Sequence, residues 1–174
     1  MIIRKNNYRH NIIKSKNFQD GQMINGQAVG FVSEMRYGLC HMSFNGCEVI
    51  SVYNALVYLK RTVPLCEIAF YMERFKLLSG IFGCNPFKVG KALEHYGIEC
   101  VHSKEIGSAK MFIVSFWTGK RFLSSIHTVF CTRSADGINI YNRYNNCSDV
   151  KICRESSEIA SPEKIIAVYI IKGE

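Results

Sequence analysis

Apolar residues follow helical patterns in the first half of the chain and short, strand-like runs in the second half. Residues 47–60 are apolar on nearly every face, and this run is too long for a typical strand, so it predicts a buried helix. Further helices are expected over residues 62–78 and 85–97, where Pro86 suits the first turn and Gly97 the stop.

The second half of the chain predicts strands. The Asp136-Gly137 pair between two of the runs is a strong hairpin signal. Helices followed by antiparallel strands make the expected fold class α+β. The runs rich in β-branched and aromatic residues are residues 98–102, 111–117, 126–132, 138–141 and 164–171.

The positive charge is concentrated near the start of the chain. There are 22 Lys and Arg against 14 Asp and Glu, a net charge of +8, and five of the basic residues lie in positions 1–19, which hold no acid. Residues 1–27 are also rich in Asn, Gln and Gly, so we expect a basic, polar arm or irregular lead-in there, and a single domain over residues 28–174. A folded nucleic-acid binder usually carries its basic excess on the domain itself, so nucleic acid is a disfavoured partner.

Composition narrows the class of protein further. A chain of 174 residues with 48% apolar content suits one domain with a substantial core. No run approaches the roughly 20 apolar residues of a membrane span, and the first residues lack the pattern of a signal peptide, so we expect a cytoplasmic protein. The eight cysteines show no C-x-x-C spacing. We therefore expect most of them to be reduced and buried, with neither metal ion nor cofactor.

Cys47 is the candidate nucleophile. It begins the predicted buried helix, directly after Asn45 and Gly46, which suit a capping region. The N–H groups and the positive dipole end of a helix N-terminus favour a thiolate, which is the nucleophile that acyl transfer needs. The alternative interpretation is an inert buried cysteine that occupies a first-turn position.

His127 is the candidate acid and base, because it lies at the start of an apolar strand. The predicted hairpin returns the chain so that Asn142 comes close to His127, where an amide oxygen orients the imidazole. At the end of the preceding strand, Trp117 is a candidate for the wall of a cleft. The alternative interpretation of His127 is a half-buried strand histidine without a catalytic role.

The order Cys47, His127, Asn142 resembles that of the papain-like cysteine peptidases. More narrowly, it is similar to the C39-type group, the leader-cleaving peptidases of bacteriocin exporters and their stand-alone relatives. The likeness extends over residues 41–145 and consists of a nucleophile at the start of a long buried helix, followed by a strand pair that carries the other two residues. It implies a papain-like fold, with the central helix packed on a C-terminal antiparallel sheet, and cleavage of peptide or other amide bonds in a peptide or protein substrate.

Two positions depart from the pattern of that group. The residue after the cysteine is commonly Gly but is Glu48 here, and the usual Gln six positions before the cysteine is His41. The candidates for the missing oxyanion donor are the His41 ring and the Asn45 amide, together with the Cys47 N–H. Loss of one such donor costs about 100- to 1,000-fold in rate. A catalytically inactive papain-like binding protein is therefore one alternative to a hydrolase. A small nucleic-acid binder that uses the basic arm is a second alternative.

Overall fold

The computed structural model describes residues 2–119 and 125–172 and has an α+β architecture. The α-helices are Ile2–Lys14 (α1), Met42–Asn45 (α2), Cys47–Tyr58 (α3), Leu65–Met72 (α4) and Val89–His95 (α5). The strands are Arg36–Tyr37 (β1), Cys40–His41 (β2), Cys100–Ser103 (β3), Met111–Thr118 (β4), Ser125–Ser134 (β5), Gly137–Tyr141 (β6), Lys151–Cys153 (β7) and Ile165–Ile171 (β8). The α+β class predicted from the sequence is confirmed.

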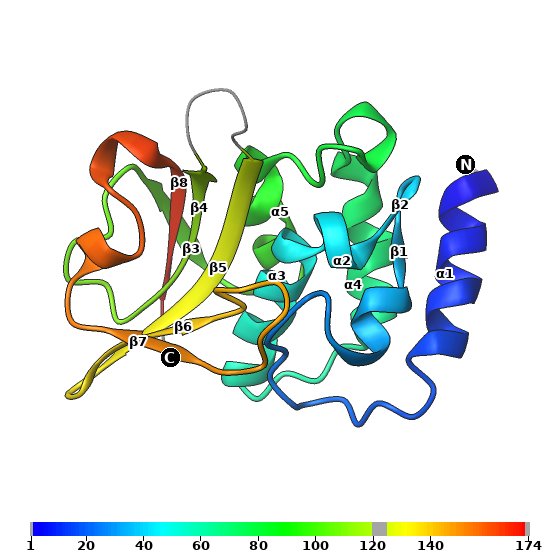
Figure 1. Ribbon diagram of the computed structural model, residues 1–174, viewed down its shortest axis with the longest axis horizontal. Helices are drawn as coiled ribbons and strands as arrows, with labels where there is room; N and C mark the ends of the chain where they lie inside the picture. Colours follow the sequence, from blue (N-terminus) through cyan, green and yellow to red (C-terminus); the bar gives the residue numbers. More distant parts are fainter. Residues whose placement is uncertain (1, 120–124, 173–174) are drawn as a thin grey trace.

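The helices gather on one side of the sheet (Figure 1). In that view α3 lies next to the strands, α4 follows it, and α1 is farthest from the sheet. The main sheet has the strand order β3-β8-β4-β5-β6-β7, and every neighbouring pair is antiparallel. Within the described residues, no helix has the length and apolar character needed to cross a membrane.

The predicted hairpin between β5 and β6 is present. Ser134 pairs with Gly137 across the turn, and the ladder continues to the pair Phe130 and Tyr141. Gly137 has a φ of +133°, and a Cβ there would lie 2.5 Å from the carbonyl oxygen of Cys153, so this position needs glycine. The hairpin brings the residues after β6 back toward the start of β5, where His127 lies.

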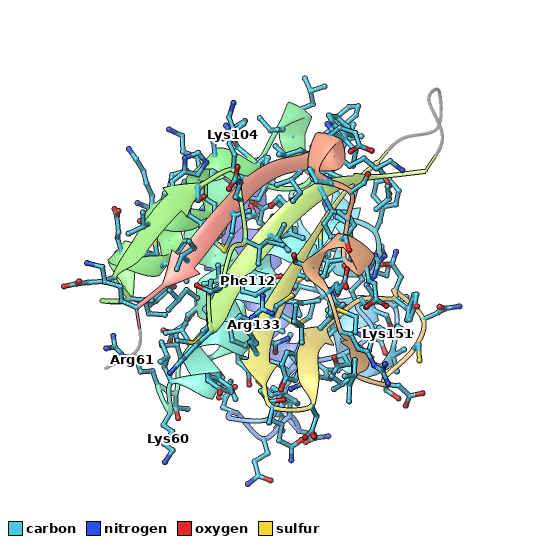
Figure 2. The ribbon with its side chains drawn as sticks, turned by 90° about the vertical axis from the view of Figure 1, so that its left-hand side faces the viewer. Lys60, Arg61, Lys104, Phe112, Arg133 and Lys151 are labelled. Atoms are coloured by element: carbon cyan, nitrogen blue, oxygen red, sulfur yellow. The ribbon has the colours of Figure 1, made fainter. Side chains whose placement is uncertain are left out.

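Both faces of the sheet are buried. Ile113 and Phe130 face the core shared with the helices, whereas Phe112 and Val114 belong to a second core on the opposite face. Figure 2 views the sheet from that opposite face, with Phe112 and Arg133 near the middle. Burial on both faces explains why β4 reads as a continuous apolar run rather than an alternating one.

Helix α3 is the central element of the main core, as the sequence predicts. Ile50 and Leu56 are fully buried in it. The Ser51 hydroxyl links the helix to the sheet, since its Oγ lies 2.8 Å from the carbonyl oxygen of Cys47 and 3.1 Å from that of Thr128 in β5. The two other predicted helices are present but shorter. Asn85 caps the second of them, as expected, by accepting a hydrogen bond from the Phe87 N–H at 3.0 Å.

The start of the chain differs from the expected irregular lead-in, because residues Ile2–Lys14 form α1 and dock on the rest of the chain. The buried residues of this helix are Asn7 and Asn11, one helical turn apart. Asn7 donates to the carbonyl of Gly38 and to Glu73, each at 2.7 Å, and Asn11 donates to the carbonyl of Arg36 at 2.9 Å. Tyr8 also packs on Phe70, but the two residues that the helix buries are polar, so the sequence shows no apolar periodicity there.

Candidate active site

A cavity of about 550 Å³ lies between the helices and the open end of the β5–β6 hairpin. The cavity is lined by residues 44, 45, 47 and 48 around the start of α3 and by the adjoining ends of β4 and β5. Residues 81–83, residues 143–146 and Gln27 complete its wall. Cys47 and His127 both line it. The structure therefore brings the two principal candidates to one cavity although they lie 80 positions apart in the sequence.

Cys47 is the first residue of α3 and is 4% exposed. Its thiol donates to a carboxyl oxygen of Glu48 at 3.3 Å. Burial, and then the negative charge of Glu48, raise the pKa of the Cys47 thiol well above its ordinary value, and the backbone of Thr128 acts weakly against them. Burial and Glu48 therefore act against the thiolate that the helix N-terminus by itself is expected to favour.

Glu48 is a buried carboxyl group beside the candidate nucleophile. Burial raises the pKa of Glu48 to about 7, against hydrogen bonds with Cys47, the backbone of Cys84 and the side chain of Thr128. Gly83 allows this close packing, since it has a φ of +69° and a Cβ there would lie 3.3 Å from a Glu48 oxygen. The sequence marked Glu48 only as a departure from a family pattern. The available signal was a charged residue inside a run that is otherwise apolar on nearly every face.

His127 lies near the start of β5 and is nearly buried. Its Nε2 lies 2.7 Å from the backbone carbonyl oxygen of Asn142, and its ring meets the Phe116 ring edge to face, with centroids 6.0 Å apart. Burial lowers the pKa of His127, the nearby charge of Arg143 lowers it further, and the bond to Asn142 acts in the opposite direction. The imidazole is therefore held in one orientation and favours its neutral form.

Asn142 contacts His127 through its backbone rather than through its side chain, which corrects the role expected for its amide. The Asn142 side chain instead bonds to Gln27: its Oδ1 accepts from the Gln27 backbone N–H at 3.0 Å, and its Nδ2 donates to the Gln27 side-chain oxygen at 3.4 Å. Asn142 has a left-handed φ of +60°, and its own N–H donates to the side chain of Asn25 at 2.9 Å. The bonds to Asn25 and Gln27 hold the turn that directs the carbonyl at His127.

The two oxyanion candidates from the sequence are not available for that role. His41 is exposed and does not line the cavity. Asn45 does line the cavity, but its amide nitrogen donates to the carbonyls of Tyr37 and Gly80. Both Asn45 amide hydrogens are thus used to hold the segment before α3 in place.

Gln27 is the residue that the sequence reasoning missed. It is buried, lines the cavity and donates from Nε2 to the carbonyl of Ser43 at 3.0 Å. An amide nitrogen has two hydrogens, so one of them remains after this bond. Gln27 lies 20 positions before Cys47, and no spacing rule connects residues so far apart.

The chain was compared with known protein families, with curated proteins and with solved structures. None of the three comparisons finds a match. The geometry of the cavity and the chemistry of its side chains are therefore the basis for any functional proposal.

The other cysteines lie outside the cavity wall. All eight are free thiols, and Cys66, Cys84, Cys131 and Cys153 are buried together with Cys47. Burial raises the pKa of Cys131 well above its ordinary value, as it does for Cys47. What distinguishes Cys47 from the rest is its place at a helix start on the same cavity as a histidine.

Proposed function

We propose that the protein is a thiol hydrolase that cleaves peptide or other amide bonds, with Cys47 as nucleophile and His127 as acid and base. The observation that carries this proposal is the cavity that Cys47 and His127 share, in which His127 is oriented by the carbonyl of Asn142. A nucleophile, a base and a group that orients the base are the three parts that acyl transfer requires.

The proton starts on sulfur in this mechanism. Burial raises the pKa of the Cys47 thiol and lowers the pKa of His127, so the thiol and the imidazole are both neutral. Nε2 of His127 is engaged with Asn142, so Nδ1 takes the thiol proton as the sulfur forms its bond to the substrate carbonyl carbon. The imidazolium then gives that proton to the leaving nitrogen, the carbon–nitrogen bond breaks, and an acyl group remains on Cys47.

Hydrolysis of the acyl group completes the cycle. Neutral His127 removes a proton from a water molecule, the water oxygen bonds to the acyl carbon, and the carbon–sulfur bond breaks. His127 returns the proton to the Cys47 sulfur, and the acid product leaves. No redox change and no cofactor enters this sequence of steps.

The negative oxygen of the tetrahedral intermediates needs hydrogen-bond donors. In our proposal these are the backbone N–H of Cys47, at the start of α3, and the remaining amide hydrogen of Gln27. Gln27 thus replaces His41 and Asn45 in that role. The same amide group is connected to the turn at Asn142, so one residue links the oxyanion donor with the orientation of His127.

A papain-like fold and a C39-type relationship belong to the same proposal. The α+β arrangement, with Cys47 at the start of a central buried helix, supports them. Orientation of the histidine by a carbonyl, and the carboxyl group after the cysteine, differ from the expected pattern.

The leading alternative is a non-catalytic protein of the same architecture. The observation in its favour is the Glu48 carboxyl beside Cys47, which disfavours the thiolate. A nucleic-acid binder is less supported, because Arg4 and Lys14 of the basic segment already contact Phe70 and Glu34. In Figure 2, Lys60, Lys104 and Lys151 lie at different edges of the molecule.

The test uses the full chain and a mixture of synthetic peptides of diverse sequence at pH 8 in a reducing buffer, with products identified by mass spectrometry. We expect cleavage by the wild type, a loss of about 1,000-fold or more in C47A and H127A, and normal rates in the control C147A. Cleavage that persists in C47A, or no cleavage by the wild type of any peptide, would overturn the hydrolase proposal.

A further inference from the structure

The mouth of the cavity is lined by large apolar side chains that are open to solvent. Phe44, Ile81, Phe82, Trp117 and Tyr144 all line the cavity, and each is between 45% and 68% exposed. They come from four separate segments of the chain, so local sequence does not explain why they meet. We refer to these five residues as the apolar rim. Exposed apolar side chains gathered around a cavity are typical of a binding site.

Few charges accompany the apolar rim. Arg143 and the buried Glu48 are the charged side chains of the described residues that line the cavity. The Arg143 guanidinium lies 5.2 Å from the ring centre of Phe116 and 5.8 Å from that of Tyr144, so its charge faces aromatic rings of the same chain. Among the described residues, a strongly charged ligand therefore finds little complementary charge at the cavity.

Uncharged hydrogen-bonding groups lie between the apolar side chains. Asn145 and Asn146 are exposed and line the cavity beside Tyr144. An amide side chain offers both donors and an acceptor, which match the N–H and C=O groups of a polypeptide backbone. A lipid chain has no hydrogen-bonding groups to pair with these amides. A peptide with apolar side chains contacts both the amides, through its backbone, and the apolar rim, through its side chains.

On the basis of the hydrolase function proposed above, we infer that the apolar rim binds a polypeptide segment with large aromatic or aliphatic side chains next to the bond presented to Cys47. The cavity of about 550 Å³ is within the usual range for ligand sites and exceeds the needs of a single small side chain. Aromatic residues supply much of the binding energy at such surfaces.

Trp117 makes this inference directly measurable, because it is the single tryptophan of the chain and belongs to the apolar rim. The experiment uses the full-length C47A variant, which leaves the peptide intact. Trp117 emission is followed while acetylated and amidated pentapeptides are added, with Phe, Leu, Asn or Asp at the central position and Ala elsewhere. We expect the Phe and Leu peptides to bind at least about tenfold more tightly than the Asn and Asp peptides.

Substitutions in the apolar rim test whether these side chains bind the peptide. In the C47A background, F44S and F82S are each expected to weaken binding of the Phe peptide by about tenfold. The matched control is F87S, because Phe87 is 57% exposed but lies outside the cavity wall. Circular dichroism of all three variants establishes that they are folded.

The possible results test peptide binding by the apolar rim separately from the hydrolase proposal. Equal affinity for apolar and polar peptides, or F44S and F82S no weaker than F87S, would overturn the inference. It would also be overturned if phosphatidylcholine vesicles shift Trp117 emission and no peptide does. Selective binding of the Phe peptide by C47A, together with no cleavage of that peptide by the wild type, supports the apolar rim and counts against the hydrolase.

Discussion

The backbone carbonyl oxygen of Asn142 lies 2.7 Å from Nε2 of His127, and the Asn142 side chain points instead to Gln27. A carbonyl oxygen only accepts hydrogen bonds, so this contact places the proton of neutral His127 on Nε2. Nδ1 is then unprotonated and able to accept the proton of Cys47. The tautomer that a thiol hydrolase needs thus follows from a backbone turn with a φ of +60°.

This relationship predicts a difference between two substitutions of Asn142. Both N142G and N142A lose the side-chain bonds to Gln27, but only glycine adopts the left-handed conformation without strain. We expect N142A to be less stable than N142G by about 1 kcal/mol and to have the lower kcat. Chemical denaturation and peptide cleavage assays measure both. Equal impairment of kcat in the two variants would mean that the lost side chain, rather than the turn, orients His127.

Substitution of Glu48 tests its effect on Cys47. Replacing the carboxyl by an amide removes the negative charge that raises the pKa of the thiol, so E48Q should ionise Cys47 at a lower pH. We expect iodoacetamide to modify Cys47 several-fold faster in E48Q than in the wild type at pH 8, as mapped by mass spectrometry. E67Q is the control, since Glu67 acts on Cys66 and not on Cys47. Slower modification in E48Q would instead identify the carboxylate as the group that removes the thiol proton.

Glu48 also predicts a pH dependence of stability. Its pKa is raised to about 7 in the folded chain, above the value of an unfolded glutamate, so the folded state binds its proton more tightly. Stability from this group is full below about pH 4.5 and falls as the pH rises to 7, by on the order of 3 kcal/mol. The free energy of unfolding of the wild type, relative to that of E48Q, should therefore be lower at pH 8 than at pH 5. His127, common to both proteins, cancels in this difference. A constant difference between the two pH values would show that Glu48 is charged at both.

Gln27 is expected to act on the transition state. Q27A removes the proposed second oxyanion donor, so kcat should fall by about 100- to 1,000-fold while KM changes little. Because Q27A also loses the bonds to Ser43 and to the Asn142 side chain, its stability is measured in parallel. A rise in KM at constant kcat would assign Gln27 to substrate binding alone.

The core prediction concerns helix α3. Leu56 is fully buried, so L56A should lower the free energy of unfolding by about 2–5 kcal/mol. I152A is the control, because Ile152 in β7 is half-exposed. A change below about 0.5 kcal/mol in L56A would contradict the central position of α3.

Local patterns in the sequence predicted most of the secondary structure. Residues 47–60 predict α3 because their apolar character covers every face, and Asp136-Gly137 predicts the β5–β6 hairpin because few residues adopt that turn. Strand β7 and helix α1 were missed, as were the short elements β1, β2 and α2. Lys151–Cys153 is short and mostly exposed, and the residues that α1 buries are asparagines, so neither shows the periodicity by which such elements are detected.

The sequence by itself determined the α+β order, the buried helix that begins at Cys47 and the hairpin that returns the chain toward His127. The tertiary structure decided the partners of the side chains: Glu48 beside Cys47, Asn45 on the carbonyls of Tyr37 and Gly80, and Asn142 on Gln27 across 115 positions. Secondary structure depends on residues close in sequence, so its pattern can be read there. The partner of a polar side chain, and the pKa that burial gives a thiol or carboxyl group, depend on which distant segments pack against it.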